Sequence, residues 1–281
     1  MIKTPVGVGQ SITVPGRPTE ITVASANTHF GRLLTSEKGL EPLSEADVLL
    51  LQEVTHKGYD LCKELARASY KVVHAVGACG LAIALHEDSN FGVVEGSQRE
   101  DVLQAPGAMA RQLVKRVPTM FAHCLWQRSV IAAKLKGPDG QKLTAAATHL
   151  VIPLRSHGRE AQVTRMGEVL RHPYYDGPLI LGGDMNHYPG PQAVDLKMRE
   201  ISNLREVDTN GEPTWRMRSS KQQWWGTAKG ALQRETLDAY DGQLDDMLYR
   251  GDGLVPQGKA KVVDVESDHR AVIARFLVGR S

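Results

Sequence analysis

Short apolar runs recur along the 281-residue chain, and they constrain its fold more than any other feature. The runs have the length of β-strands, are rich in Val, Ile and Leu, and end at turn residues. They are ITVASAN (21–27), DVLLLQEV (47–54), YKVVHAV (70–76), GLAIALHE (80–87), FGVVEG (91–96), SVIAAKLK (129–136), LTAAATHL (143–150), PLILGGDMN (178–186), DDMLYRG (245–251), AKVVDVE (260–266) and RAVIARFLV (270–278). About eleven strands predict a layered fold built on large sheets.

Two further segments have the spacing of amphipathic helices. Within 57–69, Leu61 and Leu65 lie four residues apart on one face. The segment 156–171 starts at Ser156, a common helix cap, and its apolar residues recur at helical spacing: Val163, Met166, Val169 and Leu170. Many strands with few helices predict an α/β or α+β fold.

The domain organisation is simple. No internal repeat, low-complexity tract or linker rich in Pro and Ser divides the chain. Residues 1–18 carry three prolines and three glycines, so we expect an irregular lead-in there and a single domain over residues 19–281. A chain of this length can bury a sizeable core within one domain.

Composition excludes several classes of protein. The sequence is 41% hydrophobic and 23% charged, as in soluble globular proteins rather than disordered or fibrous ones. No apolar run approaches the roughly 20 residues that span a bilayer, and the N-terminus lacks the apolar stretch of a secretory signal. The three cysteines, Cys62, Cys79 and Cys124, form no CxxC pair. We therefore expect neither a disulfide framework nor a zinc site, and a cytoplasmic location.

Polar residues stand where several apolar runs end. The run LILGG leads into Asp184 and Asn186. Side chains two residues apart in an extended chain point to the same side, so this carboxylate and amide would project together. The two glycines before them would leave room for a phosphate. A turn without any catalytic role would account for the same residues.

Two other runs end in side chains that can do chemistry. Glu53 follows LLLQ directly, where a carboxylate is either a solvated strand end or a ligand for a hard cation. His149 stands near the end of an alanine-rich strand, where a histidine is either packed in the core or catalytic. Neither residue decides the matter alone.

Two pairs of titratable residues stand at the starts of predicted strands. Asp268 and His269 come just before the last strand, and Asp245 and Asp246 open another. An aspartate that accepts a proton from histidine fixes the tautomer of the ring and raises its basicity. The sequence leaves open which aspartate faces which histidine, and whether Asp246 is a second acid of the site or a solvated one.

The order of these motifs is more specific than any one of them. Between residues 21 and 278, the sequence resembles the endonuclease/exonuclease/phosphatase superfamily, which includes deoxyribonucleases, apurinic endonucleases, inositol-polyphosphate phosphatases and neutral sphingomyelinases. The resemblance is carried, in chain order, by Asn27, Glu53 in QEV, His149 in THL, Asp184 and Asn186 in GDMN, Asp245 in LDDML, and Asp268 and His269 in SDH. It implies a deoxyribonuclease I-like two-sheet β-sandwich flanked by helices, with the site at one edge.

The resemblance also implies a role for each matching residue in a Mg²⁺-dependent hydrolysis of a phosphate ester, with Mn²⁺ as a possible substitute. Glu53 would be the main metal ligand, with Asn27 and Asp268 close to the metal or the phosphate. Asp245 would orient His269, the general base. The phosphate and its nucleophile would be held by the remaining residues: Asp184, which would position or deprotonate the nucleophile, and Asn186 and His149, which would donate hydrogen bonds to the phosphoryl oxygens.

Some details refine this resemblance. The THL motif favours the deoxyribonuclease, phosphatase or deadenylase branches over the apurinic endonucleases. Arg128 comes directly before the predicted strand 129–136 and matches an arginine often found at this place in the superfamily. His29 lies two residues beyond Asn27 and could share its side of the strand. The superfamily's additional acid or tyrosine in the middle of the chain has no clear counterpart in this sequence.

The distribution of charge favours a nucleic-acid substrate, although the net charge is only +2. The stretches 103–136 and 215–234 contain basic residues but no Asp or Glu, and they hold all four tryptophans. Cations neutralise phosphates and indole rings stack on bases. The predicted substrate-binding residues are Arg128, Arg216, Arg218, Lys221, Trp224 and Trp225.

The predicted function is therefore that of an intracellular DNA endonuclease. A phospholipid or sphingomyelin substrate is an alternative, because the same residues suit an anionic membrane interface. A small phosphate ester and a protein–DNA adduct are also compatible with the motifs, which report chemistry and not substrate. A catalytically inactive binding module is disfavoured, because the chain retains Glu53 and His269.

Overall fold

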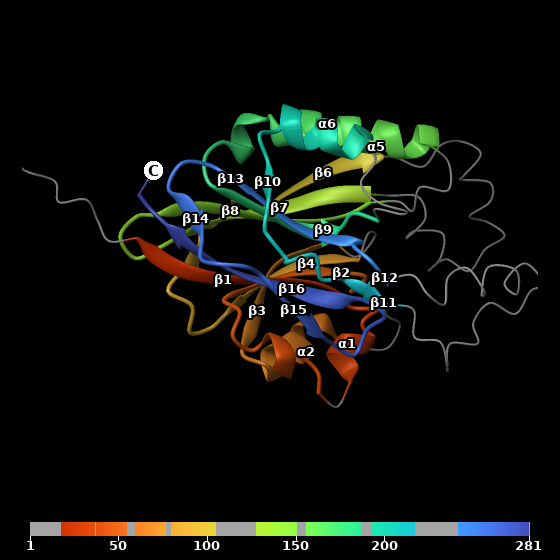
Figure 1. Cartoon of the computed structure of the whole chain (residues 1–281). Helices are drawn as coiled ribbons and strands as arrows, with labels where there is room; N and C mark the ends of the chain where they lie inside the picture. The colour runs from red at the N-terminus through yellow and green to blue at the C-terminus, as the bar shows by residue number, and fades with distance from the viewer. Residues whose placement is uncertain are drawn as a thin grey trace, which may run out of the picture.

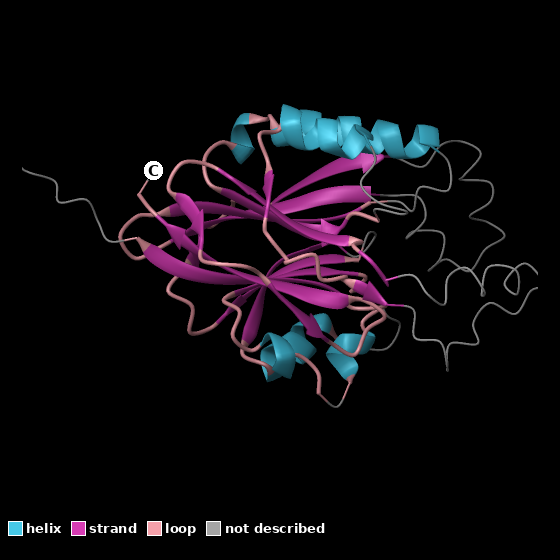
Figure 2. Cartoon of the chain, viewed as in Figure 1, coloured by secondary structure: helices cyan, strands magenta, loops and turns pink. Residues whose placement is uncertain are grey.

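A computed structural model describes residues 18–36, 38–54, 60–76, 80–104, 128–150, 156–186, 193–216 and 241–280. Two seven-stranded sheets pack face to face, and helices cover the outer face of each sheet (Figures 1 and 2). The predicted two-sheet sandwich flanked by helices is therefore confirmed. The predicted lead-in falls almost wholly on residues 1–17, outside the described residues, so the domain boundary stays a prediction.

The first sheet has the strand order β14-β16-β1-β2-β4-β3, with β15 also paired to β16. β1 and β2 run parallel, and the other pairs are antiparallel. The bounds are β1 Thr19–Asn27, β2 Val48–Gln52, β3 Tyr70–Val76, β4 Leu81–His86, β14 Leu254–Pro256, β15 Lys261–Asp264 and β16 Arg270–Val278.

The second sheet has the order β10-β13-β9-β8-β7-β5, with β6 also paired to β7. Here β8 and β9 form the parallel pair, so each sheet has one parallel pair near its centre. The bounds are β5 Gly92–Val93, β6 Arg99–Gln104, β7 Arg128–Lys136, β8 Lys142–His149, β9 Leu179–Asp184, β10 Arg205–Glu206 and β13 Asp245–Arg250. Two short strands, β11 Trp215–Arg216 and β12 Asp241–Gly242, pair separately.

Alternation along the strands sends one set of side chains between the sheets and the other set outward. The inner set forms the central core, which includes Ile21, Val23, Leu50, Ile131, Ala145 and Phe276. The outer faces of both sheets are apolar too, which is why the central strands read as continuous apolar runs.

Helices cover these outer faces. α1 (Arg32–Thr35), η1 (Glu41–Leu43) and α2 (Leu61–Arg67) pack on the first sheet, whereas α5 (Ser156–Leu170), η2 (Pro173–Tyr175) and α6 (Ala193–Ile201) pack on the second (Figure 1). The carboxylate of Asp60 caps α2 by accepting hydrogen bonds from the N–H groups of Cys62 and Lys63. None of the described helices combines the length and the apolar character that a membrane span requires.

Each of the eleven predicted strand segments contains an observed strand, and both predicted helices are present. The predicted segments run past the observed ends by one to four residues at several boundaries. The sequence analysis missed β6, α6 and several elements of two to four residues, which are α1, η1, η2, β10, β11, β12 and β14. Cys62 is an exposed free thiol, and Cys79 and Cys124 lie outside the described residues, as does the side chain of Ser156.

The glycines of LILGGD do not serve the expected purpose of making room for a phosphate. A Cβ atom on Gly182 would lie 2.8 Å from Ser25 and from Leu50 of the facing sheet. A Cβ atom on Gly183 would lie 2.3 Å from the carbonyl oxygen of Thr148 in the neighbouring strand. These glycines allow close packing of β9 against the other sheet and against β8.

We expect Gly183→Ala to destabilise the protein by about 1–3 kcal/mol, because overpacking in a rigid core is relieved only by moving the backbone. The atom that the new methyl group meets belongs to the sheet ladder and cannot rotate away. The measurement is the midpoint of urea unfolding. Gly92→Ala is the matched control, because nothing lies within 4 Å of a Cβ there. Equal midpoints for the two variants would contradict this account.

Candidate active site

The polar residues of the motifs meet at one edge of the sandwich because of the strand directions. The parallel pairs β1–β2 and β8–β9 end at this edge, whereas the antiparallel strands β13 and β16 begin there. A hydrogen bond across the sheets joins the two sets of strand ends, since Asn27 Nδ2 donates to Asp184 Oδ2 over 3.1 Å. Residues 157 positions apart in the sequence thus become neighbours.

The register of the second sheet sets three of these side chains side by side. Asp184, the last residue of β9, pairs with His149 at the end of β8 and with Asp245 at the start of β13. All three side chains are buried. A shift of one residue in either pairing would turn the side chains to the other face of the sheet.

Asp245 is the aspartate that faces His269. Nδ1 of His269 lies 2.8 Å from Asp245 Oδ2, so the ring N–H donates to the carboxylate and leaves Nε2 free to face elsewhere. Nε2 lies 3.8 Å from Asp184 Oδ2. The question that the sequence left open is thereby answered, and the arrangement has the form of a catalytic Asp–His pair.

Asp184 lies at the centre of the cluster. Its Oδ2 atom is 3.4 Å from His149 Nε2, and its Oδ1 atom accepts a hydrogen bond of 2.9 Å from the N–H of Asn186. Burial raises the pKa of Asp184 to about 6, with the charge of His269 opposing this shift and that of Asp245 adding to it.

The two histidines have opposite electrostatic environments. Burial disfavours a charged His269, but the carboxylates of Asp245 and Asp184 outweigh burial and raise the pKa of His269 well above its usual value. Burial, and then the charges of Arg128 and His269, lower the pKa of His149 well below its usual value. His149 is therefore neutral, and among the described residues its Nδ1 atom has no hydrogen-bond partner.

Glu53 and Asp268 form the more accessible side of the cluster. Their side chains are 18% and 30% exposed, against 2% for Asp184. Burial, and then the charges of Asp184 and Asp268, raise the pKa of Glu53. Burial acts in the same direction on Asp268, but its hydrogen bond with His29 and the charge of His269 lower the pKa of Asp268 to about 2.

These residues fit a hard divalent cation. The carboxylates of Glu53 and Asp268 and the amide oxygen of Asn27 are the oxygen donors that Mg²⁺ prefers. Negative charge that is buried without compensation is costly, and a cation would offset it at Glu53. A second group with ligand atoms within 4.8 Å of one another is Asp184, Asp245 and His269. Since Asp245 already occupies Nδ1 of His269, the first set is the better candidate.

Asn186 lacks the extended backbone from which we predicted that it projects together with Asp184. Strand β9 ends at Asp184, and Asn186 has a left-handed backbone with φ of 50°. Its side-chain amide donates a hydrogen bond of 2.8 Å to the carbonyl of Leu150 and so ties the ends of β8 and β9 together. Its predicted contact with a phosphoryl oxygen stays a prediction.

The sequence matches no protein-family model and resembles no curated protein closely enough to count as a relative. Its structure, however, superposes on an endonuclease/exonuclease/phosphatase family protein from Bacteroides thetaiotaomicron with a TM-score of 0.63 at 13% identity, over 93% of this chain and 99% of that one. TDP2 of D. rerio gives a TM-score of 0.63 at 15% identity, over 92% and 99% of the two chains. The chain has the endonuclease/exonuclease/phosphatase fold. The resemblance inferred from the motifs, and the deoxyribonuclease I-like class, are confirmed at the level of the fold.

A third comparison extends this result within the same fold. The endonuclease/exonuclease/phosphatase from Bacteroides vulgatus gives a TM-score of 0.60 at 12% identity, over 92% of this chain and 99% of that one. In these three comparisons the sequence identity is 12–15%, whereas the superpositions cover 92–93% of this chain. The endonuclease/exonuclease/phosphatase fold is therefore specified here by strand pattern rather than by close sequence identity.

Several predicted residues lie apart from the cluster or outside the described residues. Asp246 is buried and pairs with Arg199 over 2.5 Å, so it is not solvated. Arg128 is buried at the start of β7, and its charge acts on His149. Arg216 belongs to strand β11, but only its backbone is among the described residues. The other predicted substrate-binding residues lie outside them: Arg218, Lys221, Trp224 and Trp225.

Two threonines and a histidine at the site were missed or left without a role. The hydroxyl of Thr214 accepts hydrogen bonds of 3.0 Å from the N–H groups of Leu244 and Asp245 and so holds the start of β13. Thr28 and His29 contact the residues predicted to bind the metal. An uncharged threonine in a loop gives no sequence signal of this kind, whereas the position of His29 after Asn27 gave a weak one.

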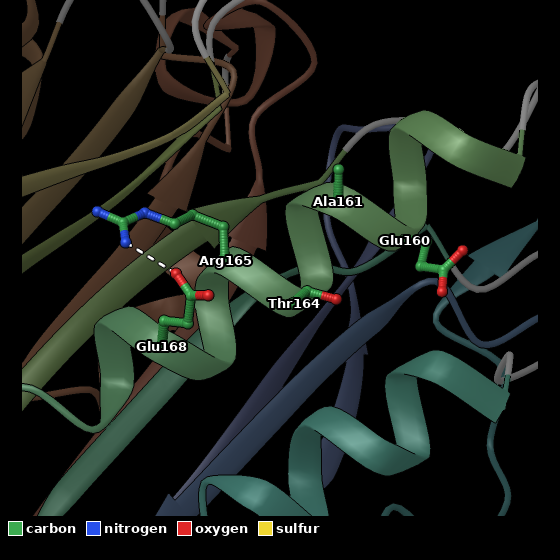
Figure 3. A pocket seen from close by; sticks show the side chains of 5 residues that line it. All are labelled: Glu160, Ala161, Thr164, Arg165 and Glu168. Atoms are coloured by element: carbon green, nitrogen blue, oxygen red, sulfur yellow. Dashed lines mark hydrogen bonds and ion pairs between the residues drawn. The ribbon is translucent and has the colours of Figure 1, made fainter.

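A separate depression lies on the exposed surface of α5. It is lined by Glu160, Ala161, Thr164, Arg165 and Glu168, all from the one helix (Figure 3). Two of these residues, Arg165 and Glu168, form an ion pair over 2.9 Å. None of the residues of the polar cluster lines it. This depression is therefore separate from the cluster at the strand ends.

Proposed function

We propose that the protein is a metal-dependent phosphodiester hydrolase, with Mg²⁺ as its ion and Mn²⁺ as a possible substitute. The observation that carries this proposal is the hydrogen-bonded pair of Asp245 and His269. The Nε2 atom of His269 faces Asp184, and the carboxylate of Glu53 lies close enough for its charge to interact with both residues. An activated proton acceptor and an oxygen-rich cation site in one cluster are what hydrolysis of an anionic ester requires.

Each residue then has a definite task. Asp245 holds the ring of His269 in one tautomer, so that Nε2 accepts the proton of the attacking water. Asp184, whose Oδ2 atom lies 3.8 Å from Nε2, would accept a second hydrogen bond from that water and so orient it beside the ring. A bound Mg²⁺ would neutralise charge on the phosphate. The same positive charge would oppose the carboxylates that raise the pKa of His269 and so favour its neutral, proton-accepting form.

Nucleic acid, and DNA in particular, is the substrate we propose. The stretches without acidic residues support this choice, because basic side chains and tryptophans suit a polyanion with stacking bases. One protein of the same fold, D. rerio TDP2, has been solved in complex with a single-stranded DNA product.

Smaller phosphate esters form the second candidate class. An inositol polyphosphate 5-phosphatase domain of the same fold has been solved with inositol (1,4)-bisphosphate and a calcium ion, and ANGEL2, also of this fold, is described as a 2',3'-cyclic phosphatase. The chemistry proposed for Asp245 and His269 serves these substrates equally well.

The test is the nicking of supercoiled plasmid with Mg²⁺ and with EDTA. We expect relaxed circles with Mg²⁺ and none with EDTA, because the phosphate charge is then not neutralised. Circular dichroism of the EDTA-treated protein controls for unfolding. Nicking in EDTA would contradict metal dependence. Hydrolysis of inositol phosphates or cyclic phosphates without any nicking would move the substrate to the second class, and no hydrolysis of any of them would contradict the proposed function.

A further inference from the structure

The turn that follows Asn27 has an unusual backbone. Three consecutive residues are left-handed: His29 with φ of 48°, Phe30 with φ of 55° and Gly31 with φ of 79°. Only the last of them is a glycine, for which this region is free of steric cost. Residues held in such sparsely populated conformations persist where the surroundings fix them, and they gather at functional sites.

Thr28 supplies one of the contacts that fix the turn. It is fully buried, and its hydroxyl donates a hydrogen bond of 2.9 Å to the carbonyl of Glu53. The same hydroxyl accepts a hydrogen bond of 3.1 Å from the N–H of Gly31. Glu53 is itself left-handed, with φ of 56°. A single hydroxyl thus joins the left-handed segments that follow the neighbouring parallel strands β1 and β2.

His29 supplies two more hydrogen bonds. Its backbone N–H donates a hydrogen bond of 2.9 Å to the amide oxygen of Asn27. Its ring atom Nδ1 lies 2.7 Å from Asp268 Oδ1. The ring also packs edge-on against Phe30, with the ring centroids 5.8 Å apart. The orientation of the Asp268 carboxylate is therefore coupled to this turn.

The four residues from Thr28 to Gly31, called here the 28–31 turn, thus make one hydrogen bond to each residue predicted to bind the metal. These bonds reach the amide oxygen of Asn27, the backbone of Glu53 and the carboxylate of Asp268. A turn that served only to lead β1 into α1 would need none of them. Groups that hydrogen-bond to metal ligands fix the orientation of those ligands and so control the affinity for the metal.

We propose that the 28–31 turn is the positioning element of the metal site, with Thr28 acting through Glu53 and His29 acting through Asp268. This inference rests on the proposed function, since it takes Glu53, Asn27 and Asp268 as the residues that hold the ion. Thr28 keeps the left-handed backbone of Glu53 in place and so aims its carboxylate. His29 holds the carboxylate of Asp268 at the same edge of the sandwich.

The experiment measures Mn²⁺ affinity from the electron paramagnetic resonance signal of the free ion, without any turnover. Thr28→Val keeps the shape of the side chain and removes the hydroxyl, and we expect its dissociation constant to rise about 10-fold, the lower end of the effect of such supporting residues. Thr28→Ser restores the hydroxyl and should bind as the wild type does. The rescue separates positioning from a general loss of structure.

Tyr70→Phe is the matched control. It also removes a buried hydroxyl that bonds to backbone carbonyls, those of Leu43 and Ala46, but on the helix-covered outer face of the first sheet. We expect this variant to lose stability in urea without any change in Mn²⁺ affinity. An equal loss of Mn²⁺ affinity in Tyr70→Phe and Thr28→Val would overturn the assignment, because the effect would then follow stability.

His29 keeps the proposal testable if Thr28→Val does not fold, because its side chain is 29% exposed. His29→Ala should weaken Mn²⁺ binding, whereas His29→Asn should retain most of it, because asparagine tolerates a left-handed backbone and offers an N–H near the position of Nδ1. Wild-type affinity in Thr28→Val or His29→Ala would overturn the inference and leave the proposed function standing. A wild-type protein that binds no Mn²⁺ would overturn both.

Discussion

His269→Ala is expected to lower the turnover of phosphodiester hydrolysis by about 10²–10⁴-fold, the usual effect of removing a general base. Nε2 of His269 faces the buried carboxylate of Asp184, and the carboxylates around the ring make it a strong proton acceptor. Without the imidazole, the attacking water has no such acceptor at this place. Single-turnover rates at saturating Mg²⁺ separate this loss from any change in metal binding.

The pair with Asp245 makes the prediction sharper. Asp245→Asn removes the carboxylate that fixes the tautomer of His269, so it should also reduce the rate by orders of magnitude. Residues that act as one unit give non-additive losses. The double variant His269→Ala/Asp245→Asn should therefore be about as slow as His269→Ala alone. Multiplied losses in the double variant would show that the two side chains act separately.

His172→Ala is the matched control for His269→Ala, because His172 is an exposed histidine that caps the short helix η2. It should retain wild-type turnover. Circular dichroism and the midpoint of urea unfolding establish whether each variant folds. A folded His269→Ala variant with a near-wild-type rate would remove the Asp245–His269 pair from the mechanism.

The sheets were predictable from the sequence because their central strands are apolar on both faces. Leu49 and Leu51 pack under the helices of the first sheet, and Leu50 packs between the sheets, so the whole run VLLL is buried. The same holds for LIL before Asp184, where the side chains of Leu179 and Leu181 face outward to helices. Such runs are visible without any knowledge of which strands pair.

The elements that were missed lack this signal. β6, with the sequence REDVLQ, carries three charged residues, and β7 is its only partner among the described strands. Arg99 and Asp101 of β6 pair with each other. α6 has Val194, Met198 and Ile201 at helical spacing, but the helix is only nine residues long, and the structure leaves Ile201 exposed. Edge strands and peripheral helices can carry such sequences because few of their side chains enter the core.

The residues of the candidate site could be predicted from the sequence, whereas the contacts between them could not. The motifs named Asp245, Asp184 and His269, but only the pairing of β9 with β13 and β16 with β1 decides which of them meet. The side of Asn186 was predicted from an extended backbone, but its backbone is left-handed. Long-range register and local backbone reversals depend on tertiary packing, which no short motif records.

Glu53→Gln is the prediction with the other large effect, because it separates the metal site from the Asp245–His269 pair. Loss of the carboxylate should lower turnover by about 10³-fold at a fixed low Mg²⁺ concentration, since a bound cation contributes several kcal/mol to catalysis and about 1.4 kcal/mol corresponds to a factor of ten. Raising the Mg²⁺ concentration should recover part of this loss. It should recover none of the loss in His269→Ala.

Glu53→Gln should leave the metal-free protein as stable as the wild type or more so, but it should lose the stabilisation that Mg²⁺ gives to the wild type. Burial and the neighbouring acids raise the pKa of Glu53, so its charged form opposes folding of the metal-free protein at neutral pH. Glu53→Gln removes that charge, and we expect its metal-free melting temperature to be equal to the wild type's or higher. Mg²⁺ should raise the melting temperature of the wild type but not of the variant, because only a folded protein that binds the ion is stabilised by it.

Glu45→Gln is the matched control, because Glu45 is an exposed glutamate paired with Lys261 over 2.7 Å. It should keep the stabilisation by Mg²⁺ in full. If Glu53→Gln also keeps it while Asp184→Asn loses it, the ion lies instead between Asp184, Asp245 and His269. Nδ1 of His269 would then have to leave Asp245 or Nε2 would have to bind the ion, and either change would end the role of this ring as a proton acceptor. The melting curves of these variants thus decide between two incompatible uses of His269.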